Sequence, residues 1–221
     1  RTAASLSRKH LYYLAVCLQA IALSWRFNSN RAQLDRLPSN IIATLDSEFC
    51  RRLQVFDHLE LRVRFLRCDD VILGGIHFDS GESAFRAFII MGAIQYLPLP
   101  DKRSGGIRRA LCIGLGVGSV QRMLQQNHII VDTVEIDPSV RDAALNHFNF
   151  SPNGEIFIED ALVWIKGGGR GKLYDYVAHD IFTYDSETMT NLYTQDAFEM
   201  MKNLMTPGGV VVINFVGFTS G

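Results

Sequence analysis

The sequence lacks a charge excess, has few cysteines and contains no apolar run of membrane-spanning length. Its 221 residues include 22 lysines and arginines and 23 aspartates and glutamates, so the net charge is −1. That balance gives no electrostatic case for a nucleic acid or an anionic membrane as partner. With 48% hydrophobic and 20% charged residues, the composition excludes a disordered tail, a collagen-like rod and a small disulfide-stapled protein. The length predicts one domain with room for a small appendage.

The cysteines form no C-x-x-C pair and have no histidine at ligand spacing; they are Cys17, Cys50, Cys68 and Cys112. This pattern argues against a structural zinc site, and we expect no metal. Cys112 lies inside an apolar, strand-like run, where a thiol behaves as a small hydrophobe. Because cysteines of intracellular proteins rarely pair, we expect four reduced structural thiols.

One segment, LYYLAVCLQAIALSW at 11–25, has the composition of a membrane segment. As a helix it would be about 23 Å long, short of the roughly 30 Å hydrocarbon core of a bilayer. It can be a helix packed on the domain or close to a membrane, a truncated membrane span, or a signal-peptide core. No small-residue cleavage pattern follows it cleanly, which disfavours the signal peptide. We favour the packed or membrane-proximal helix.

The two ends of the chain also bear on its organisation. The chain begins at Arg1 rather than at a methionine, and it stops at Gly221 just after an apolar run. Both facts indicate a processed form or a fragment. We expect a cytoplasmic protein, with association to a membrane through the N-terminal segment left open.

Three segments differ in their pattern. Residues 1–50 predict an N-terminal helical segment. In residues 51–100, apolar side chains and arginines alternate with the period of a half-buried strand, which predicts a small antiparallel sheet up to residue 78. A helix is predicted after it, at 83–97. Residues 101–221 predict a separate α/β domain.

In 101–221 apolar strands alternate with helices. The predicted strands are RALCIGLG, IIVDTVEID, GEIFIED, YDYVAHDIF and GVVVINFVG, and the helices between them are VGSVQRMLQQN, PSVRDAALNHF, ALVWIKGG and MTNLYTQDAFEMMKNLM. Five strands joined by four helices predict a doubly wound, mostly parallel sheet. Strands that are apolar throughout are typical of a sheet covered on both faces.

A glycine loop follows the first of these strands. Gly114, Gly116 and Gly118 lie between the strand and a helix, where a nucleotide site needs the backbone to approach its ligand. Glu135 ends the second strand, where an acid can accept both hydroxyls of a ribose. The alternatives are a tight strand-to-helix turn and a solvated acid at a strand end. Asp137 is expected to cap the next helix.

Four further polar residues end later strands. Asp160, followed by Ala161, can bind an adenine or cap the next helix, and one residue can do both. Asp180 can hold an ammonium group or take its proton, whereas His179 beside it is expected to face the opposite way and pack in the core. Asn214 is either a cleft contact or a hydrogen-bonded core residue. All of them lie at carboxyl ends of strands, where open α/β sheets bind ligands.

The motifs GLGVGSVQRML, TVEIDPSVRDAALNHF, IEDALVWI, YDYVAHDIF and LMTPGGVVVINF, in this order, resemble the polyamine synthase family, the spermidine and spermine synthases. The resemblance covers about residues 53–217 and is closest to a fungal-type branch. It implies the class I S-adenosylmethionine-dependent methyltransferase fold, whose sheet normally has two more strands after the fifth; this sequence stops before them.

The resemblance also implies a function. S-adenosylmethionine or its decarboxylated form would be the co-substrate, bound by 101–221, and an aminopropyl group would pass to a small-molecule amine or another nucleophile without a metal. By position, Gly114, Gly116 and Gly118 would line the amino-acid part of the cofactor, and Glu135 would bind its ribose. Asp160 and Ala161 would bind the adenine, and Asp180 would help to deprotonate the attacking amine. A homodimer is left open.

Three positions depart from the family pattern. Val117 stands where active synthases carry an acid in the glycine loop, Phe85 stands where a tyrosine is expected, and no second aspartate closely follows Asp180. A polycation would therefore meet few partners for its ammonium groups. Three alternatives stay open: an S-adenosylmethionine-dependent methyltransferase, a catalytically inactive binding or scaffold protein and, last, a nicotinamide oxidoreductase.

Overall fold

The structure is a computed structural model that describes residues 39–96, 107–181 and 191–214. All of them belong to one compact unit, Ser39–Phe215. The predicted helix at 11–25 lies outside the described residues, and so does Cys17. Within the described ranges, no helix is long and apolar enough to cross a membrane.

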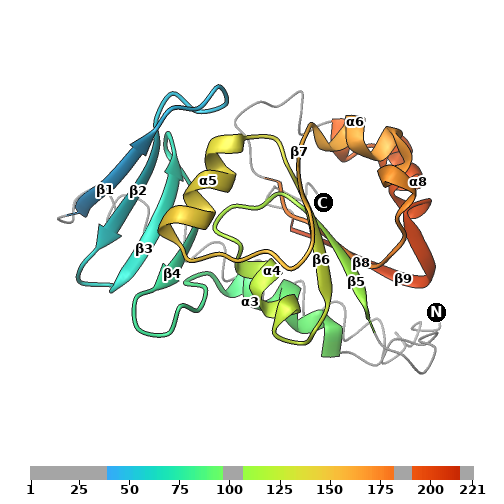
Figure 1. The fold of residues 1–221 in the computed structure, drawn as a ribbon, viewed down its shortest axis with the longest axis horizontal. Coiled ribbons are helices and arrows are strands. Elements are labelled where there is room, and N and C mark those ends of the chain that lie inside the picture. Colours follow the sequence, from blue (N-terminus) through green and yellow to red (C-terminus); the bar gives the residue numbers. More distant parts are fainter. Residues whose placement is uncertain (1–38, 97–106, 182–190, 215–221) are drawn as a thin grey trace, which may run out of the picture. The chain divides into compact units, whose positions relative to one another are not determined.

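The described chain opens with a four-stranded antiparallel sheet, made of β1 (Ser39–Leu45), β2 (Leu53–His58), β3 (Val63–Cys68) and β4 (Val71–His77). The strands lie side by side in chain order (Figure 1), which confirms the sheet predicted for 51–78. The prediction of a helical segment over 1–50 is wrong for residues 39–45. The sequence SNIIATL in β1 contains β-branched residues, which favour strands, and it pairs antiparallel with β2.

A short helix, α3 (Arg86–Ala93), and a 3-10 turn, η1 (Ile94–Tyr96), follow this sheet. They correspond to the helix predicted for 83–97. Phe88 and Met91 are buried on the inner side of α3.

The remaining strands form a parallel sheet, made of β5 (Arg109–Ile113), β6 (Ile130–Glu135), β7 (Ile156–Ile158), β8 (Tyr174–His179) and β9 (Met205–Ile213). Their spatial order is β7-β6-β5-β8-β9, and every neighbouring pair is parallel. The chain builds outward from β5 to β7 and then returns to add β8 on the other side of β5. This order confirms the predicted doubly wound sheet, and its switch point lies between β5 and β8.

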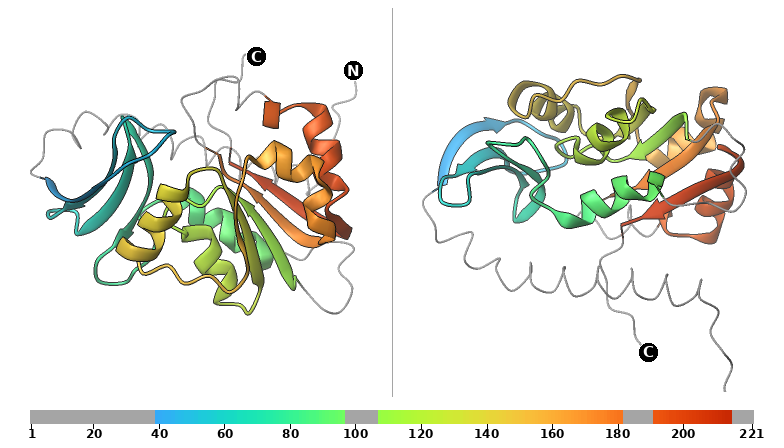
Figure 2. Two further views of the ribbon diagram at one scale, coloured as in Figure 1. Left: turned by 45° about the horizontal axis from the view of Figure 1, so that its top comes forward. Right: turned by 90° about the horizontal axis from the view of Figure 1, so that it is seen from below.

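The helices of this part are α4 (Ser119–Gln125), α5 (Pro138–His147), α6 (Ala161–Lys166) and α8 (Gln195–Lys202), with a 3-10 turn η2 (Gly168–Gly171) after α6. Alternate side chains of β5 enter different buried clusters. Leu111 and Ile113 pack with residues of α6 and α8, whereas Ala110 and Cys112 pack with residues of α3 and α4. The green helices and the orange and red helices accordingly lie on opposite sides of the sheet (Figure 2).

The antiparallel sheet packs against α5 and against the loop that follows β5. Leu66 of β3 shares a buried cluster with Val140 of α5 and with Val117 of that loop. The Arg64 guanidinium also donates a hydrogen bond of 3.0 Å to the carbonyl oxygen of His147, at the end of α5. The small sheet therefore supports the glycine loop from one side.

Cys50 and Cys68 form a disulfide, so the expectation of four reduced thiols is wrong for this pair. Strands β2 and β3 pair antiparallel with Leu53 opposite Cys68, and this register brings the Cα atoms of the two cysteines to 5.4 Å. That separation suits a disulfide, but it follows from strand pairing and not from the spacing of cysteines in the sequence. Cys112 is free and buried, as predicted.

Candidate functional site

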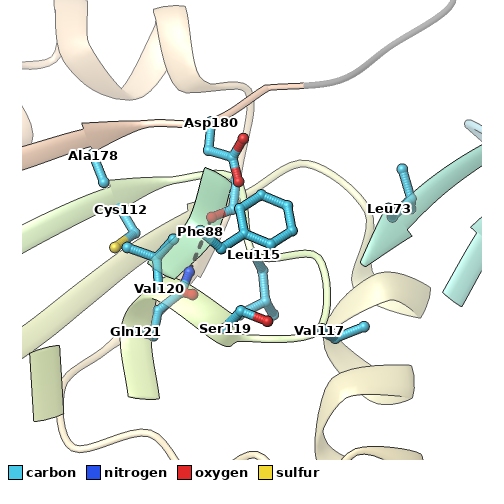
Figure 3. Close-up of a pocket in the computed structure, with 11 residues that line it drawn as sticks. Leu73, Phe88, Cys112, Leu115, Val117, Ser119, Val120, Gln121, Ala178 and Asp180 are labelled. Atoms are coloured by element: carbon cyan, nitrogen blue, oxygen red, sulfur yellow. Dashed lines mark hydrogen bonds between the residues drawn. The ribbon is translucent and has the colours of Figure 1, made fainter. Parts of the chain in front are cut away.

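A small pocket lies at the carboxyl ends of β5 and β8, at the switch point of the parallel sheet (Figure 3). The loop between β5 and α4 contributes much of its lining, and β4 and α3 each contribute a side chain. Sites at such switch points are where open α/β sheets bind ligands. The lining residues used below are Leu73, Gly114, Val117, Ser119, Gln121 and Asp180.

The glycine loop is shaped by close approaches to the protein's own backbone. Gly114 has φ 94°, and a Cβ atom there would overlap the carbonyl oxygen of Asp180. A Cβ atom at Gly116, with φ 53°, would lie 2.7 Å from the carbonyl oxygen of Leu73. Both positions therefore require glycine before any ligand is considered. Gly114 lines the pocket; Gly116 and Gly118 are not among the described residues that line it.

Glu135 ends β6, as predicted, and holds the glycine loop. Its side chain is 8% exposed. One carboxylate oxygen accepts a hydrogen bond of 2.9 Å from the backbone amide of Leu115, and the other accepts one of 3.0 Å from the amide of Asp137. Burial raises the pKa of this carboxyl, and the backbone amides of Asp137, Leu115 and Ile136 partly offset the effect. A carboxylate has about four lone-pair sites, so acceptor capacity is left for a ligand hydroxyl.

Asp137 and Asp160 both cap helices. The Asp137 carboxylate accepts a hydrogen bond of 2.8 Å from the amide of Ser139 at the start of α5, which confirms its predicted capping role. Asp160 accepts one of 3.0 Å from the amide of Val163 and caps α6, one of the two roles weighed for it. Ala161 is buried. Binding of an adenine by Asp160 and Ala161 stays a prediction.

Asp180 follows β8, and its carboxylate is the charged group among the described residues that line the pocket. Asn214, which follows β9, donates a hydrogen bond of 2.9 Å from Nδ2 to Oδ1 of Asp180. Asn214 is thus a partner of a pocket residue. Burial raises the pKa of the Asp180 carboxyl to about 6, and the bond from Asn214 opposes that rise. At neutral pH Asp180 is a carboxylate with more basicity than an exposed aspartate.

His179, one residue earlier, is fully buried on the other face of the sheet, as predicted. Its ring lies edge-on to Tyr193 at 4.7 Å and near Phe198 at 6.2 Å between centroids. Burial lowers the pKa of this imidazole, so it is neutral at pH 7. The strand alternation thus separates a packing histidine from a pocket carboxylate.

The sequence was compared with those of known proteins. No protein-family model matches the chain. An N-terminal histidine N-methyltransferase of Emericella nidulans is 30% identical over 181 residues, which make up 75% of this chain and 32% of that protein. A polyamine aminopropyltransferase of Vibrio vulnificus is 38% identical over 115 residues, 48% of this chain and 37% of that one. The chain spans about a third of the length of these curated relatives.

Solved structures agree on the fold. A probable spermidine synthase from Corynebacterium glutamicum superposes with a TM-score of 0.63 at 18% identity, covering 79% of this chain and 63% of that one. A spermidine synthase in complex with the transition-state analogue AdoDATO gives 0.58 at 16% identity, covering 75% and 54%. The chain has the class I methyltransferase fold.

This class I methyltransferase-fold chain is homologous to polyamine aminopropyltransferases, which confirms the resemblance drawn from its motifs. It is also homologous to a protein N-terminal methyltransferase, a relative that the motifs did not single out. The fungal-type branch stays a prediction.

Two of the residues that depart from the polyamine synthase pattern, Val117 and Phe85, are packed against other apolar side chains. Val117 lines the pocket, is 1% exposed and belongs to the buried cluster under the antiparallel sheet. Gly74 of β4 leaves room for it, since a Cβ atom there would lie 2.8 Å from a Val117 methyl group. Phe85 packs between Phe65 and Phe88, with centroids 6.2 and 5.6 Å away. Both positions are apolar and packed.

Sequence reasoning missed two polar residues of the pocket, Ser119 and Gln121. Gln121 donates a hydrogen bond of 3.0 Å to the carbonyl oxygen of Gly114, and it is 2% exposed. Ser119, the first residue of α4, is 6% exposed. The available signal was that Ser119 directly follows the last loop glycine and that Gln121 lies two residues further along. Over the described ranges, no group of three histidine, cysteine or acidic side chains is arranged to hold a metal ion.

Proposed function

We propose that this class I methyltransferase-fold chain is a transferase that takes an S-adenosyl-type sulfonium as co-substrate and passes an alkyl group from it to an amine nitrogen. The observation that carries the proposal is the Asp180 carboxylate, which lines a pocket beside the glycine loop at the switch point of the sheet. The relatives support the same class of reaction, since their names describe aminopropyl transfer and N-methyl transfer.

In the main form of the proposal, an aminopropyl group passes from decarboxylated S-adenosylmethionine to a small-molecule amine. The acceptor nitrogen attacks the carbon bonded to the sulfonium sulfur, so a C–N bond forms while the C–S bond breaks and its electron pair returns to sulfur. The nitrogen gives up a proton, which the Asp180 carboxylate accepts. A carboxyl with a pKa of about 6 is suited to this step, because it is ionised at pH 7 and yet a stronger base than ordinary aspartate.

The residues at the strand ends fit the nucleoside part of such a co-substrate. Glu135 is a buried carboxylate with acceptor capacity left for a ribose hydroxyl. Asp160 uses one oxygen to cap α6 and keeps the other for an adenine amine, with Ala161 beside it. Gly114, Gly116 and Gly118 shape the loop that would approach the amino-acid part. The co-substrate supplies the electrophilic carbon, and these residues orient it.

Methyl transfer to an amine is the second candidate, and a specific observation favours it. The position at which polyamine synthases are expected to carry a loop carboxylate holds Val117, which is 1% exposed and packed. An extra ammonium group at this end of the pocket would have to be desolvated without an opposite charge from the loop. The relative with the longest aligned segment given above is an N-methyltransferase.

The finer features of this function are part of the same proposal. We infer a small-molecule acceptor and a cytoplasmic location. Formation of a homodimer and contact of 11–25 with a membrane stay predictions.

The test is calorimetric titration and turnover of the purified protein. The protein is titrated with 5′-methylthioadenosine, S-adenosylmethionine and decarboxylated S-adenosylmethionine, and each sulfonium is then incubated with a set of diamines and with peptides that carry a free N-terminus. We expect binding of the nucleoside and alkylation of an amine, detected by mass as an added aminopropyl or methyl group. The variant Glu135→Gln is titrated with 5′-methylthioadenosine as well, and we expect it to bind more weakly than the unaltered protein. Glu159→Gln, at a neighbouring strand end, is its control.

The results of this test distinguish aminopropyl transfer, methyl transfer and a scaffold protein. An added aminopropyl group supports the main form, and an added methyl group supports the second candidate. Binding without any turnover would leave a scaffold protein. Failure of a folded sample to bind any of the three nucleosides would overturn the proposal as a whole.

A further inference from the structure

The loop between β1 and β2 forms two hydrogen bonds with the start of α5, the helix that follows β6. The Ser47 hydroxyl donates one of 2.6 Å to Oδ2 of Asp137, and the Ser139 hydroxyl donates one to the carbonyl oxygen of Asp46. The bonded residues are 90 and 93 positions apart in the chain. The antiparallel sheet is therefore connected to the turn that directly follows Glu135.

The Ser47 hydroxyl forms all the hydrogen bonds of which a serine is capable. It donates its proton to Asp137, and its oxygen accepts hydrogen bonds of 3.0 Å from the backbone amides of both Phe49 and Cys50. A serine hydroxyl has one donor and two acceptor sites, so each of them has a partner here. Because the two amides fix the oxygen, its proton points at the carboxylate.

Asp137 connects Ser47 to Glu135, the candidate ribose-binding residue. Asp137 is 2% exposed, and its other carboxylate oxygen accepts the bond from the Ser139 amide. Its own backbone amide donates the hydrogen bond of 3.0 Å to Oε1 of Glu135. A shift of Asp137 would therefore move one of the amides that orient the Glu135 carboxylate.

The disulfide between Cys50 and Cys68 holds the loop that carries Ser47. Cys50, whose amide bonds the Ser47 hydroxyl, is joined covalently by this disulfide to the last residue of β3. Close to the disulfide, the backbone amide of Arg52 donates a hydrogen bond of 3.0 Å to the carboxylate of Asp69. The loop is thus attached to β3 at one end and to the start of α5 through Ser47.

We propose that Ser47 is a positioning residue of the nucleoside site: its hydroxyl holds Asp137, and through Asp137 it fixes the Glu135 carboxylate in the orientation that a ribose hydroxyl requires. The disulfide keeps the loop in place, so its reduction weakens nucleoside binding. Reduction breaks the S–S bond with two electrons and two protons from a dithiol, which is itself oxidised to a disulfide. The inference rests on the proposed function, because it concerns the binding of a ribose at Glu135.

The test measures affinity for 5′-methylthioadenosine by calorimetry, and thermal unfolding shows that each variant is folded at the assay temperature. We expect Ser47→Ala to weaken binding about fivefold, because the Asp137 carboxylate loses a group that holds it. Ser47→Thr keeps the hydroxyl and should bind within about twofold of the unaltered protein. Ser80→Ala is the matched control: the Ser80 hydroxyl accepts a hydrogen bond of 3.2 Å from the Glu82 amide in an exposed turn, and its loss should leave the affinity unchanged.

A double-mutant cycle distinguishes positioning from a general effect on the fold. If Ser47 acts through Glu135, Ser47→Ala should change the affinity by less than about twofold in a protein that already carries Glu135→Gln. A general effect on the fold would instead weaken binding equally in both backgrounds.

The role of the disulfide is measured on the same ligand. Dithiothreitol should weaken binding of 5′-methylthioadenosine to the unaltered protein at least about threefold. The double variant Cys50→Ala with Cys68→Ala should bind as weakly as the reduced protein, with and without the reductant. Alkylation of the thiols, followed by mass measurement, shows that the disulfide has been reduced.

Each part of the inference can fail separately. Unchanged affinity in Ser47→Ala, equal losses in both backgrounds of the cycle, or a Ser47→Thr that binds as weakly as Ser47→Ala would overturn the role of the Ser47 hydroxyl. Equal affinity of the oxidised and the reduced protein would overturn the role of the disulfide. In either case the proposed ribose site stands if Glu135→Gln weakens binding. If the unaltered protein binds no nucleoside, or if Glu135→Gln binds as tightly as the unaltered protein, the proposed site itself fails.

Discussion

Asn214 and Asp180 end neighbouring parallel strands, and the amide of Asn214 donates a hydrogen bond of 2.9 Å to the Asp180 carboxylate. The strand register that pairs His179 with Ile213 brings the two following residues side by side. The amide holds the carboxylate of the pocket and opposes the rise of its pKa.

Replacement of Asp180 by asparagine should abolish most of the catalytic rate. Removal of a general base typically costs about 10²–10⁴-fold in rate, whereas the nucleoside contacts lie elsewhere and should be retained. In the unaltered protein the rate should rise with pH through about 6, because the carboxyl must lose its proton to act as a base. Turnover over a pH series checks both points; nucleoside affinity that falls together with the rate would contradict them.

The same replacement should stabilise the protein at pH 7. The pKa of Asp180 is raised in the folded state above its ordinary value of 3.8, so folding favours the protonated form. The stabilising contribution of the neutral acid is therefore present below about pH 4 and is lost as the pH rises through about 6. Asp180→Asn should raise the free energy of unfolding at pH 7 by about 3 kcal/mol, and by little at pH 3.5. Denaturant titrations at both pH values, with Asp196→Asn at an exposed site as control, test this.

Asn214→Ala should raise the pKa of Asp180 further. The hydrogen bond from Asn214 stabilises the ionised carboxylate, and the variant lacks that bond. The midpoint of the acidic limb of the rate profile should move up by about one pH unit. A second variant, Asn214→Asp, should also move the midpoint up, because a carboxylate beside Asp180 disfavours ionisation of Asp180. A midpoint that stays in place in Asn214→Ala would show that the bond does not set the basicity of Asp180.

Reduction of the disulfide between Cys50 and Cys68 should lower the free energy of unfolding. The two cysteines are 18 residues apart, and a crosslink over a loop of this length contributes about 3 kcal/mol. Unfolding by urea with and without dithiothreitol measures the effect. The double variant Cys50→Ala with Cys68→Ala serves as control, because reductant should have no effect on it.

Glu135→Gln should weaken the binding of 5′-methylthioadenosine at least about tenfold. The glutamate accepts backbone amides with both oxygens, but glutamine offers one acceptor oxygen and places an NH₂ group against the other amide. The glycine loop would lose its bond at Leu115 or the turn would lose its bond at Asp137. Calorimetry on this variant and on Glu159→Gln compares the two strand-end acids; equal behaviour of the two would argue against a ribose site at Glu135.

The local elements of this protein follow from the sequence, since their signals are local. Apolar strands that end in glycine or an acid, and helices that begin with a cap such as Asp137 before Pro138, depend on neighbouring residues alone. For this reason the alternation of strands and helices, the parallel sheet and the place of the glycine loop could be predicted. The position of Asp180 at a strand end could be predicted as well.

Contacts that depend on which strands lie next to each other are determined by the tertiary structure. Cys50 and Cys68 pair because β2 and β3 align, and Gly116 must be glycine because Leu73 of another sheet lies against it. Asn214 reaches Asp180 through the register of β8 and β9, although 34 residues separate them in the chain. Such contacts between distant segments leave no mark on local spacing, because strand pairing and burial are settled only when the whole unit packs.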